Sequence, residues 1–292
     1  MADRAGPWHQ RRRSGNHTLV SGLLIAGWMI CQSAFTPVRA AGEPGSQATL
    51  PLPLTSAAGQ DLLMRPGTRR ADYGSLSQWF ETQANLAYCG VATSVMVLNS
   101  LALPAPKAEN HGSYRFWTQT NVFAAPATTS FVQAAVVARE GMSLEQLHGL
   151  LASQGAVVRR YHGDQLSLEQ FRRLVRRNLE DPRDRLLANY DRRAVGQAGG
   201  GHISPLAAFD PRSDRVLILD VARYRYPAVW VAIADLWRAV ATLDRSSGRS
   251  RGLLIIQATA QQPETSPPPG PSGNGRHADA RTPENVPATR NP

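Results

Sequence analysis

Cys89, one of two cysteines in the chain, lies in the stretch QANLAYCGVATSVMVLNSL, where a Cys-Gly step leads into an apolar run with helical spacing. The first turn of a helix has unpaired backbone N–H groups and the positive end of the dipole, and both stabilise a thiolate. Gly90 leaves out a side chain beside the sulfur, which suits an approaching carbonyl. We therefore predict a nucleophile, although a free cysteine is more often a buried apolar filler.

A thiolate nucleophile usually works with an imidazole that a third group orients. His202 is the candidate, because it follows three glycines that end at Gly201 and would let a substrate backbone approach, and because it begins an apolar strand-like stretch. The remaining histidines after residue 40 are expected to be surface residues in loops, in a helix or in the C-terminal tail: His111, His148, His162 and His277.

Asp220 is the predicted orienting group. If the turn DPRSD is centred near Arg212, Asp220 faces Ser204 across an antiparallel hairpin. His202 and Asp220 then lie on one face as diagonal neighbours. The carboxylate ends the apolar run VLIL and needs a partner, which the imidazole Nδ1–H can supply. The alternative is an aspartate that only caps the end of the strand.

Gln83 lies six residues before Cys89. Its side-chain amide could donate to the oxyanion of a tetrahedral intermediate together with the backbone N–H of the nucleophile. A glutamine in a loop is ordinary, so this signal is weak alone. In combination with the lone thiol, the histidine and the aspartate, it indicates acyl transfer.

The elements that would hold these residues follow from periodicity and caps. Helices are predicted over residues 89–102, 143–155, 167–180 and 233–244, with Ser143 and Ser167 as N-caps that each have a glutamine three residues later. Strands are predicted over 156–162, 185–190, 202–209, 215–222 and 251–258. Helices come first and a mostly antiparallel sheet follows, which is typical of an α+β domain.

The two ends of the chain are predicted to lie outside this domain. Residues 1–40 have a basic stretch, an apolar run and a Val-Arg-Ala cleavage site, as in a secretory signal peptide; the alternative is an uncleaved membrane anchor. We expect an N-terminal extension over 41–70, the catalytic domain over 71–260 and a disordered Pro/Gly-rich tail over 261–292. The mature protein is expected to be exported, in the periplasm, without stable membrane insertion.

Charge and cysteine content narrow the classes of partner. Loss of residues 1–40, with five Arg and one Asp, lowers the formal charge from +10 to +6. The arginines are scattered except for runs such as FRRLVRRN, which has the spacing of a solvated helix face, so we expect no nucleic-acid partner. Cys31 would leave with the signal peptide, and the remaining Cys89 cannot form an internal disulfide.

Three segments together resemble the phytochelatin synthase family of papain-like cysteine transferases: FETQANLAYCGVATSVMVLNSL, GGGHISPLAAFDPRSDRVLILDVARYRYPAVWV and LWRAVATLDRSSGRSRGLL. The resemblance runs over residues 76–257. It implies a papain-like fold, with an N-terminal helical part that has the catalytic cysteine at a helix start and with a C-terminal antiparallel sheet. It also implies that the cysteine attacks the Cys-Gly amide of glutathione, that glycine leaves, and that water or a second glutathione resolves the γ-glutamylcysteinyl thioester.

The resemblance assigns a role to each matching residue. It makes Cys89 the nucleophile, His202 the general acid/base, Asp220 its orienting group and Gln83 the oxyanion donor. It implies that Asp244 and Arg251 bind the α-ammonium and α-carboxylate of the γ-glutamyl group, with Gly201 beside the substrate. Without the resemblance, Asp244 and Arg251 would be interpreted as a surface pair of opposite charge.

Plant members of the family carry a further cysteine-rich domain linked to metal response, and we see no metal-ligand cluster in this sequence. We therefore expect no required cofactor and no metal ligands, with Cd²⁺ or Zn²⁺ acting through glutathione thiolates or the Cys89 thiol. Glutathione is the expected partner, and a homodimer is left open. Two rivals are a general cysteine peptidase and a non-catalytic module that binds glutathione or metal–thiolate complexes.

Overall fold

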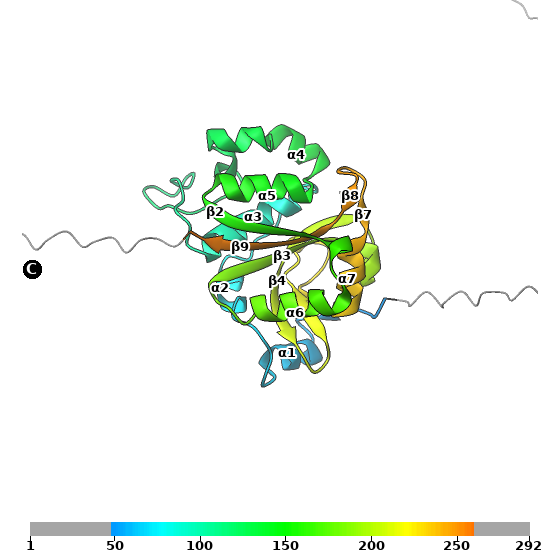
Figure 1. Ribbon diagram of the computed structural model, residues 1–292. Coiled ribbons are helices and arrows are strands. Elements are labelled where there is room, and N and C mark those ends of the chain that lie inside the picture. Colours follow the sequence, from blue (N-terminus) through cyan, green and yellow to red (C-terminus); the bar gives the residue numbers. More distant parts are fainter. Residues whose placement is uncertain (1–47, 260–292) are drawn as a thin grey trace, which may run out of the picture. The chain divides into compact units, whose positions relative to one another are not determined.

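A seven-stranded antiparallel sheet lies at the centre of the protein in the computed structural model, which describes residues 48–259 (Figure 1). The strand order is β1-β6-β5-β4-β3-β9-β2, and β7 and β8 form a separate two-stranded sheet. The strands are β1 (Leu52–Pro53), β2 (Ala156–His162), β3 (Asp184–Asp191), β4 (Gly201–Asp210), β5 (Arg215–Ile218), β6 (Val229–Ala232), β7 (Leu243–Asp244), β8 (Arg249–Ser250) and β9 (Gly252–Ala258). The predicted signal peptide and C-terminal tail lie outside the described residues.

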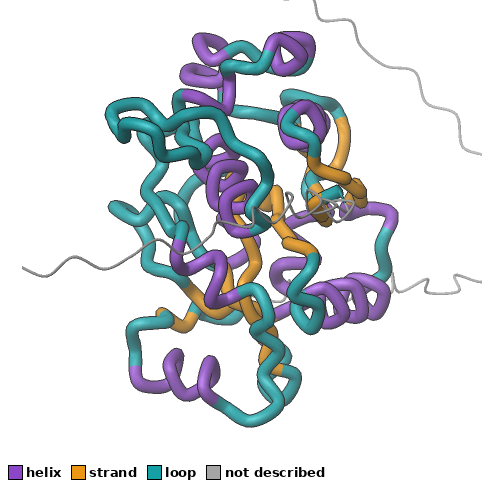
Figure 2. The backbone as a smooth tube through the Cα atoms, turned by 90° about the vertical axis from the view of Figure 1, so that its left-hand side faces the viewer, coloured by secondary structure: helices purple, strands orange, loops and turns teal. Residues whose placement is uncertain are grey.

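Helices cover both faces of the sheet (Figures 1 and 2). They are α1 (Ala57–Met64), α2 (Tyr73–Gln78), α3 (Cys89–Ser100), α4 (Ala134–Glu140), α5 (Leu144–Ser153), α6 (Leu168–Asn178) and α7 (Ile233–Ala241). One hydrophobic cluster joins α3 and α5 to one face, and a second joins α6 and α7 to the other. The predicted α+β class with a mostly antiparallel sheet is confirmed.

Local sequence signals account for the helices that flank the site. Ser143 and Ser167 cap α5 and α6, and in each case the glutamine three residues later completes a capping box. Strand β2 has the predicted bounds of 156–162. The predicted strand over 215–222 ends earlier, at Ile218, and a bulge shifts the β4–β5 register between Leu206 and Ala208.

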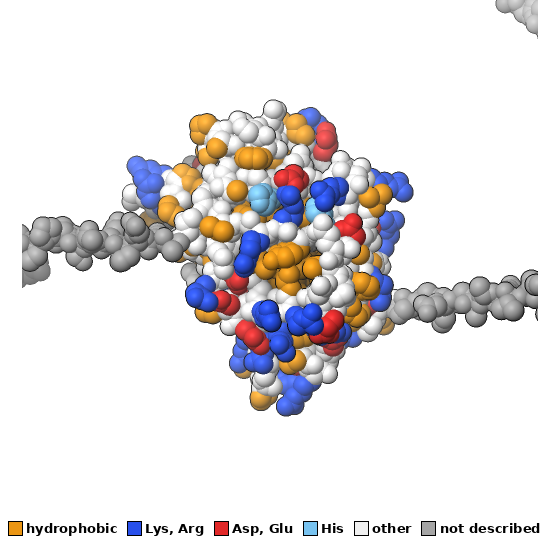
Figure 3. Space-filling view, in the orientation of Figure 1, with side chains coloured by type: hydrophobic (Ala, Val, Ile, Leu, Met, Phe, Trp, Pro, Cys, Tyr) orange, Lys and Arg blue, Asp and Glu red, His pale blue; other side chains and the backbone are white. Residues whose placement is uncertain are grey.

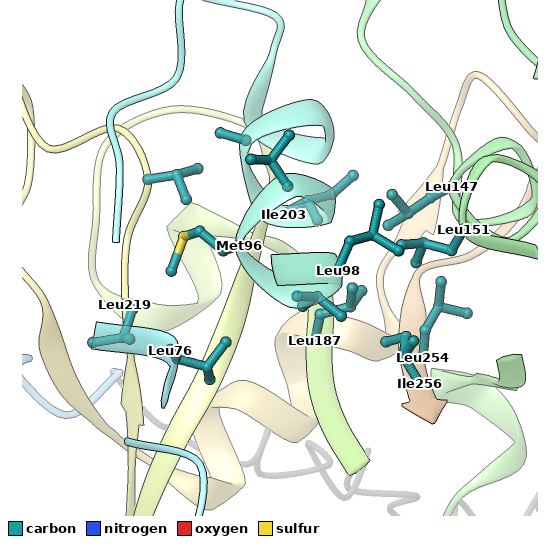
Figure 4. Packing of buried hydrophobic residues seen from close by; sticks show 14 of the residues in the cluster. Leu76, Met96, Leu98, Leu147, Leu151, Leu187, Ile203, Leu219, Leu254 and Ile256 are labelled. Carbon is teal, nitrogen blue, oxygen red and sulfur yellow. The ribbon is translucent and has the colours of Figure 1, made fainter. Parts of the chain in front are cut away.

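Helix α3 is buried on nearly all sides, since ten of its 12 residues are buried. Figure 4 shows Met96 and Leu98 of this helix among side chains from the sheet, from α2 and from α5. Because α3 is held from several directions, its first residue, Cys89, has a fixed position relative to the start of β4, where His202 lies. This rigidity is what a catalytic thiol requires.

Several elements were not predicted. Among them are α1, α2 and α4 and the short strands β1 and β6. Strand β1 pairs with β6 at the edge of the sheet, and Leu62 and Leu63 of α1 enter the first hydrophobic cluster. The indole N–H of Trp230 in β6 donates to the carbonyl of Gly59 in α1 at 2.9 Å. Residues 52–64 therefore pack on the central sheet.

Within residues 48–259, no helix combines the length and the apolar character that crossing a bilayer requires.

Candidate active site

Cys89 is the first residue of α3, so its backbone N–H has no acceptor within the helix. We had predicted that Gly90 leaves room beside the sulfur for a carbonyl, and the structure gives a further reason for a glycine here. A Cβ atom at this position would lie 2.5 Å from Met142 Cε and 3.2 Å from Ile203 Cδ1. The glycine lets the start of α3 pack tightly against β4 and the segment before α5.

The structure brings His202 and Asp220 into contact, with His202 Nε2 at 2.8 Å from Asp220 Oδ1. The pairing of Leu206 with Ile218 has the register used in the prediction, and Val221 N–H donates to Ser204 Oγ at 3.3 Å beyond the end of the ladder. The ring nitrogen at the carboxylate is Nε2, whereas we had predicted Nδ1. Nδ1 is consequently the nitrogen that can face Cys89.

The Cys89 thiol and the His202 imidazole each shift the pKa of the other. Burial alone would raise the pKa of the Cys89 thiol, but a hydrogen bond with His202, its charge, and backbone interactions at Ile203 and Gly90 lower that pKa overall. Burial alone would lower the pKa of His202, but Asp220 and Cys89 raise it. The two shifts in opposite directions favour a thiolate–imidazolium pair, which is the reactive form of a cysteine nucleophile.

Arg192 was not predicted from the sequence, although it contacts the orienting carboxylate directly. Its guanidinium donates to Asp220 Oδ2 at 2.6 Å and to Oδ1 at 2.9 Å. Burial alone would raise the pKa of Asp220, but hydrogen bonds from His202 and Arg192 lower it far below the ordinary value. Gln197 and the ring of Tyr226 hold the guanidinium in turn. Asp220 is thus a fixed anion behind the imidazole.

Tyr190 and Ser204 complete the surroundings of the imidazole. The ring of Tyr190 is fully buried and meets the His202 ring edge-on at a centroid distance of 5.7 Å. Ser204 Oγ lies 3.0 Å from His202 Nε2. Both contacts limit rotation of the ring and keep water away from the His202–Asp220 hydrogen bond.

Cys89 and His202 line a cavity of about 350 Å³ that Asp244 and Arg251 also line. These two residues come from the β7–β8 hairpin and the start of β9, and both are largely buried, with Arg251 Nη1 at 3.7 Å from Asp244 Oδ2. They are therefore not an exposed surface pair. Leu86 and Arg139 also line this cavity.

Arg251 is aimed by neighbours that sequence reasoning did not identify. Its Nη1 donates to Asn189 Oδ1 at 2.8 Å. A Cβ atom at Gly201 would lie 2.4 Å from the same Nη1, so only glycine leaves room for the guanidinium. Arg251 Nε and Asn189 Nδ2 are buried and have no partner within residues 48–259. These unpaired donors could bind a carboxylate.

Gln83 is buried and does not line the cavity. Its Nε2 donates to the carbonyl of Asn85 at 2.7 Å, and its backbone N–H donates to Val221 O at 3.0 Å. An amide nitrogen has two hydrogens, so one N–H of Gln83 is still available. The predicted role as an oxyanion donor stays a prediction.

The prediction that His162 is a surface residue was wrong. It is only 6% exposed at the end of β2, and its Nδ1 lies 2.8 Å from the carbonyl of Ser250. It supports the β8 segment that precedes Arg251. In the part of the chain that the structure describes, no group of three or more His, Cys, Asp or Glu side chains could hold a metal ion.

A model of the family described as phytochelatin synthase matches residues 47–253. The chain belongs to the phytochelatin synthase family. The chain is 32% identical over 200 residues to glutathione gamma-glutamylcysteinyltransferase 2 of Arabidopsis thaliana, which covers 68% of this chain and 42% of the relative. It is 31% identical to glutathione gamma-glutamylcysteinyltransferase 1 of Lotus japonicus, over 71% of this chain and 40% of the relative.

The enzyme of this name from Schizosaccharomyces pombe (strain 972 / ATCC 24843) is 29% identical over 70% of this chain and 49% of the relative. This phytochelatin synthase family member therefore spans less than half the length of these relatives. The family match covers all six side chains that sequence analysis assigned to catalysis and to binding of the γ-glutamyl group.

Proposed function

We propose that this chain is a papain-like cysteine acyltransferase that cleaves the Cys-Gly amide of glutathione. The observation that carries the proposal is one cavity that is lined by both Cys89 and His202 and by Asp244 and Arg251. A nucleophile alone would suit many amides. A buried pair of opposite charges beside it suits a substrate whose terminal group is an amino acid zwitterion.

Acylation begins from the thiolate–imidazolium pair. Cys89 Sγ attacks the carbonyl carbon of the substrate cysteine residue, a C–S bond forms, and the carbonyl π electrons move to oxygen. His202 then gives its proton to the amide nitrogen, the C–N bond breaks, and glycine leaves. Asp220, held by Arg192, stabilises the imidazolium and keeps the ring in position.

Negative charge on the carbonyl oxygen needs donors that are already in place. The backbone N–H of Cys89 at the start of α3 is one, and the second N–H of the Gln83 amide is the other. Gln83 is anchored at its backbone N–H by Val221, the residue after Asp220. This anchor would couple the oxyanion donor to the hairpin that holds the acid/base pair.

Asp244, Arg251 and Asn189, which also line the cavity, would recognise the γ-glutamyl end. The unpaired Nε–H of Arg251 and the unpaired amide of Asn189 would bind the α-carboxylate. Asp244, whose Oδ1 accepts hydrogen bonds from Ser246, would bind the α-ammonium. A long polypeptide has no free zwitterion at this point, so the pair favours glutathione over a general peptidase substrate.

Deacylation uses His202 as a base. It takes a proton from water, or from the α-amine of a second glutathione, as that atom attacks the thioester and the C–S bond breaks. Water yields γ-glutamylcysteine, and a second glutathione yields a phytochelatin. We propose that Cd²⁺ or Zn²⁺ enters as a glutathione thiolate complex. Addition of Cd²⁺ should therefore change the ratio of the two products, which product analysis with and without Cd²⁺ measures.

Release of glycine from glutathione tests the proposal. The wild-type protein should release glycine and the Cys89→Ala variant should not; equal release would contradict covalent catalysis by Cys89. Intact-mass measurement after rapid quenching should show a γ-glutamylcysteinyl adduct on the wild type. Binding of glutathione without glycine release would favour the non-catalytic module.

Arg251→Ala distinguishes the glutathione enzyme from a peptidase. Loss of the carboxylate contact should lower kcat/KM for glutathione by about 10- to 100-fold, the equivalent of one charge-assisted hydrogen bond. A general peptidase would keep its activity on a casein-derived peptide.

We also propose that the enzyme works in the periplasm, and sequencing the N-terminus of protein from a periplasmic fraction would test whether residues 1–40 are removed.

A further inference from the structure

A second cavity, of about 440 Å³, lies between α6 and the strands β2, β3 and β9. It is on the opposite face of the sheet from α3 and shares no lining residue with the Cys89 cavity. Figure 3 shows this face of the molecule, where a hydrophobic patch near the centre is bordered by Lys and Arg side chains. The volume is in the usual range for small-molecule sites.

Two buried polar side chains line this cavity and have unpaired atoms. Asn178, the last residue of α6, is 3% exposed, and neither its Nδ2 nor its Oδ1 has a hydrogen-bond partner within residues 48–259. Asp184, the first residue of β3, is 6% exposed, and its Oδ1 is also unpaired there. Buried polar groups in folded proteins nearly always have partners. The two side chains are neighbours, and neither the Asn178 amide nor Asp184 Oδ1 has a well-formed hydrogen bond to a described residue.

The environment of Asp184 favours a cationic partner. Burial raises the pKa of this carboxyl to about 6, and the charge of Asp181 adds to the rise, although a side-chain interaction with the neighbouring Asn178 amide and the charges of Arg159 and Arg185 lower it. A buried carboxylate with a raised pKa gains free energy when an ammonium group binds beside it. Binding of an ammonium would therefore lower this pKa.

Two cationic groups at the rim complement that carboxylate. Arg159 of β2 and Arg177 of α6 line the cavity and make no ion pair with any described residue, whereas Arg173 is paired with Glu169. The lining also includes the apolar side chains of Leu166, Leu174 and Ile255. The lining thus combines the buried carboxylate of Asp184, apolar side chains and exposed cations, together with the carboxylate of Asp181, which is paired with Arg183.

We propose that this cavity binds a small zwitterion with an apolar side chain, which is the chemistry of a hydrophobic amino acid or dipeptide. The ammonium group lies at Asp184 and Asn178, the carboxylate lies at Arg177 and Arg159, and the side chain lies against the apolar wall. The site is separate from the Cys89 cavity and does not depend on the proposed acyl transfer. Strand β9 links the two, because it lines this cavity and begins next to Arg251.

Titration of the full protein with L-leucine and L-leucyl-L-leucine tests the proposal. Binding is monitored by ¹H–¹⁵N NMR and by thermal unfolding. At least one of the two should shift amide signals of α6 and β9 and raise Tm. N-acetyl-L-leucine lacks the ammonium group and L-leucinamide lacks the carboxylate, so each should bind at least about tenfold more weakly than L-leucine. The proposal is wrong if neither zwitterion binds at millimolar concentration, or if N-acetyl-L-leucine binds as well as L-leucine.

Variants locate the binding within the cavity. Asp184→Asn and Arg177→Ala should each weaken binding of the zwitterion by about tenfold or more, because each removes one charged contact. Arg176→Ala is the matched control, since Arg176 is the exposed neighbour of Arg177 on α6 and does not line the cavity. If Asp184→Asn does not fold, the surface variant Arg177→Ala decides. Equal losses in Arg176→Ala and Arg177→Ala would reject a specific site.

Discussion

At the scale of single residues, the pair of Cys89 and His202 predicts the pH dependence of glycine release. The pKa of the thiol is lowered from 9.0 and that of the imidazole is raised from 6.5, and both shifts increase the population of the thiolate–imidazolium form. The rate should rise with pH through a limb below 9.0 as the thiol ionises and fall through a limb above 6.5 as His202 loses its proton. A profile that rises to a plateau with no alkaline limb would contradict an acid role of His202.

Arg192 contacts Asp220, so its effect on catalysis is expected to come from positioning Asp220 and His202 and not from contact with the substrate. Arg192→Lys keeps the charge but loses the bidentate grip on Asp220, so the carboxylate and the imidazole should drift from their positions. We expect kcat to fall by up to about 10²-fold and the alkaline limb to move to lower pH, with little change in KM. Arg193→Lys is the matched control, because that side chain is 74% exposed and pairs with Asp191. Similar losses in both variants would indicate a general structural defect.

At the scale of elements, local signals predicted more than long-range geometry did. The capping boxes of α5 and α6 and the bounds of β2 follow from residues close in sequence. The contact of His202 with Asp220 was also predicted, although the register next to the turn differs by one residue and the bulge between Leu206 and Ala208 restores the predicted pairing at Ile218. Arg192 lies 28 residues from its partner Asp220, and nothing in the sequence marks the two as neighbours. Similarly, whether Nε2 or Nδ1 of His202 contacts Asp220 depends on the position of Cys89 at the start of α3 relative to the imidazole. Sequence periodicity does not encode that position.

The N-cap of α5 should contribute to the stability of the site. This helix packs on β2 and β9 and follows residues 139–142, which line the cavity. Ser143→Ala removes the side-chain acceptor for the N–H of Gln146 and should lower the free energy of unfolding by about 1 kcal/mol. Ser143→Asp restores an acceptor at the same place and should recover most of the loss. Urea unfolding of both variants measures the difference. No change in the alanine variant would show that water replaces the cap.

At the scale of the whole molecule, the question is where the folded domain begins. Residues 41–70 were expected to be an extension, yet α1 packs on the sheet and Leu62 is 5% exposed. Leu62→Ala should therefore lower the stability of the entire domain by about 2–5 kcal/mol, through lost burial and an unfilled space. Met64→Ala is the matched control in the same helix, because Met64 is 68% exposed. Calorimetry should give one transition at a lower Tm for Leu62→Ala and an unchanged Tm for Met64→Ala. If Leu62→Ala leaves the Tm of the main transition unchanged, α1 unfolds separately from the rest of the domain. The cavity around Cys89 would then be stable without α1.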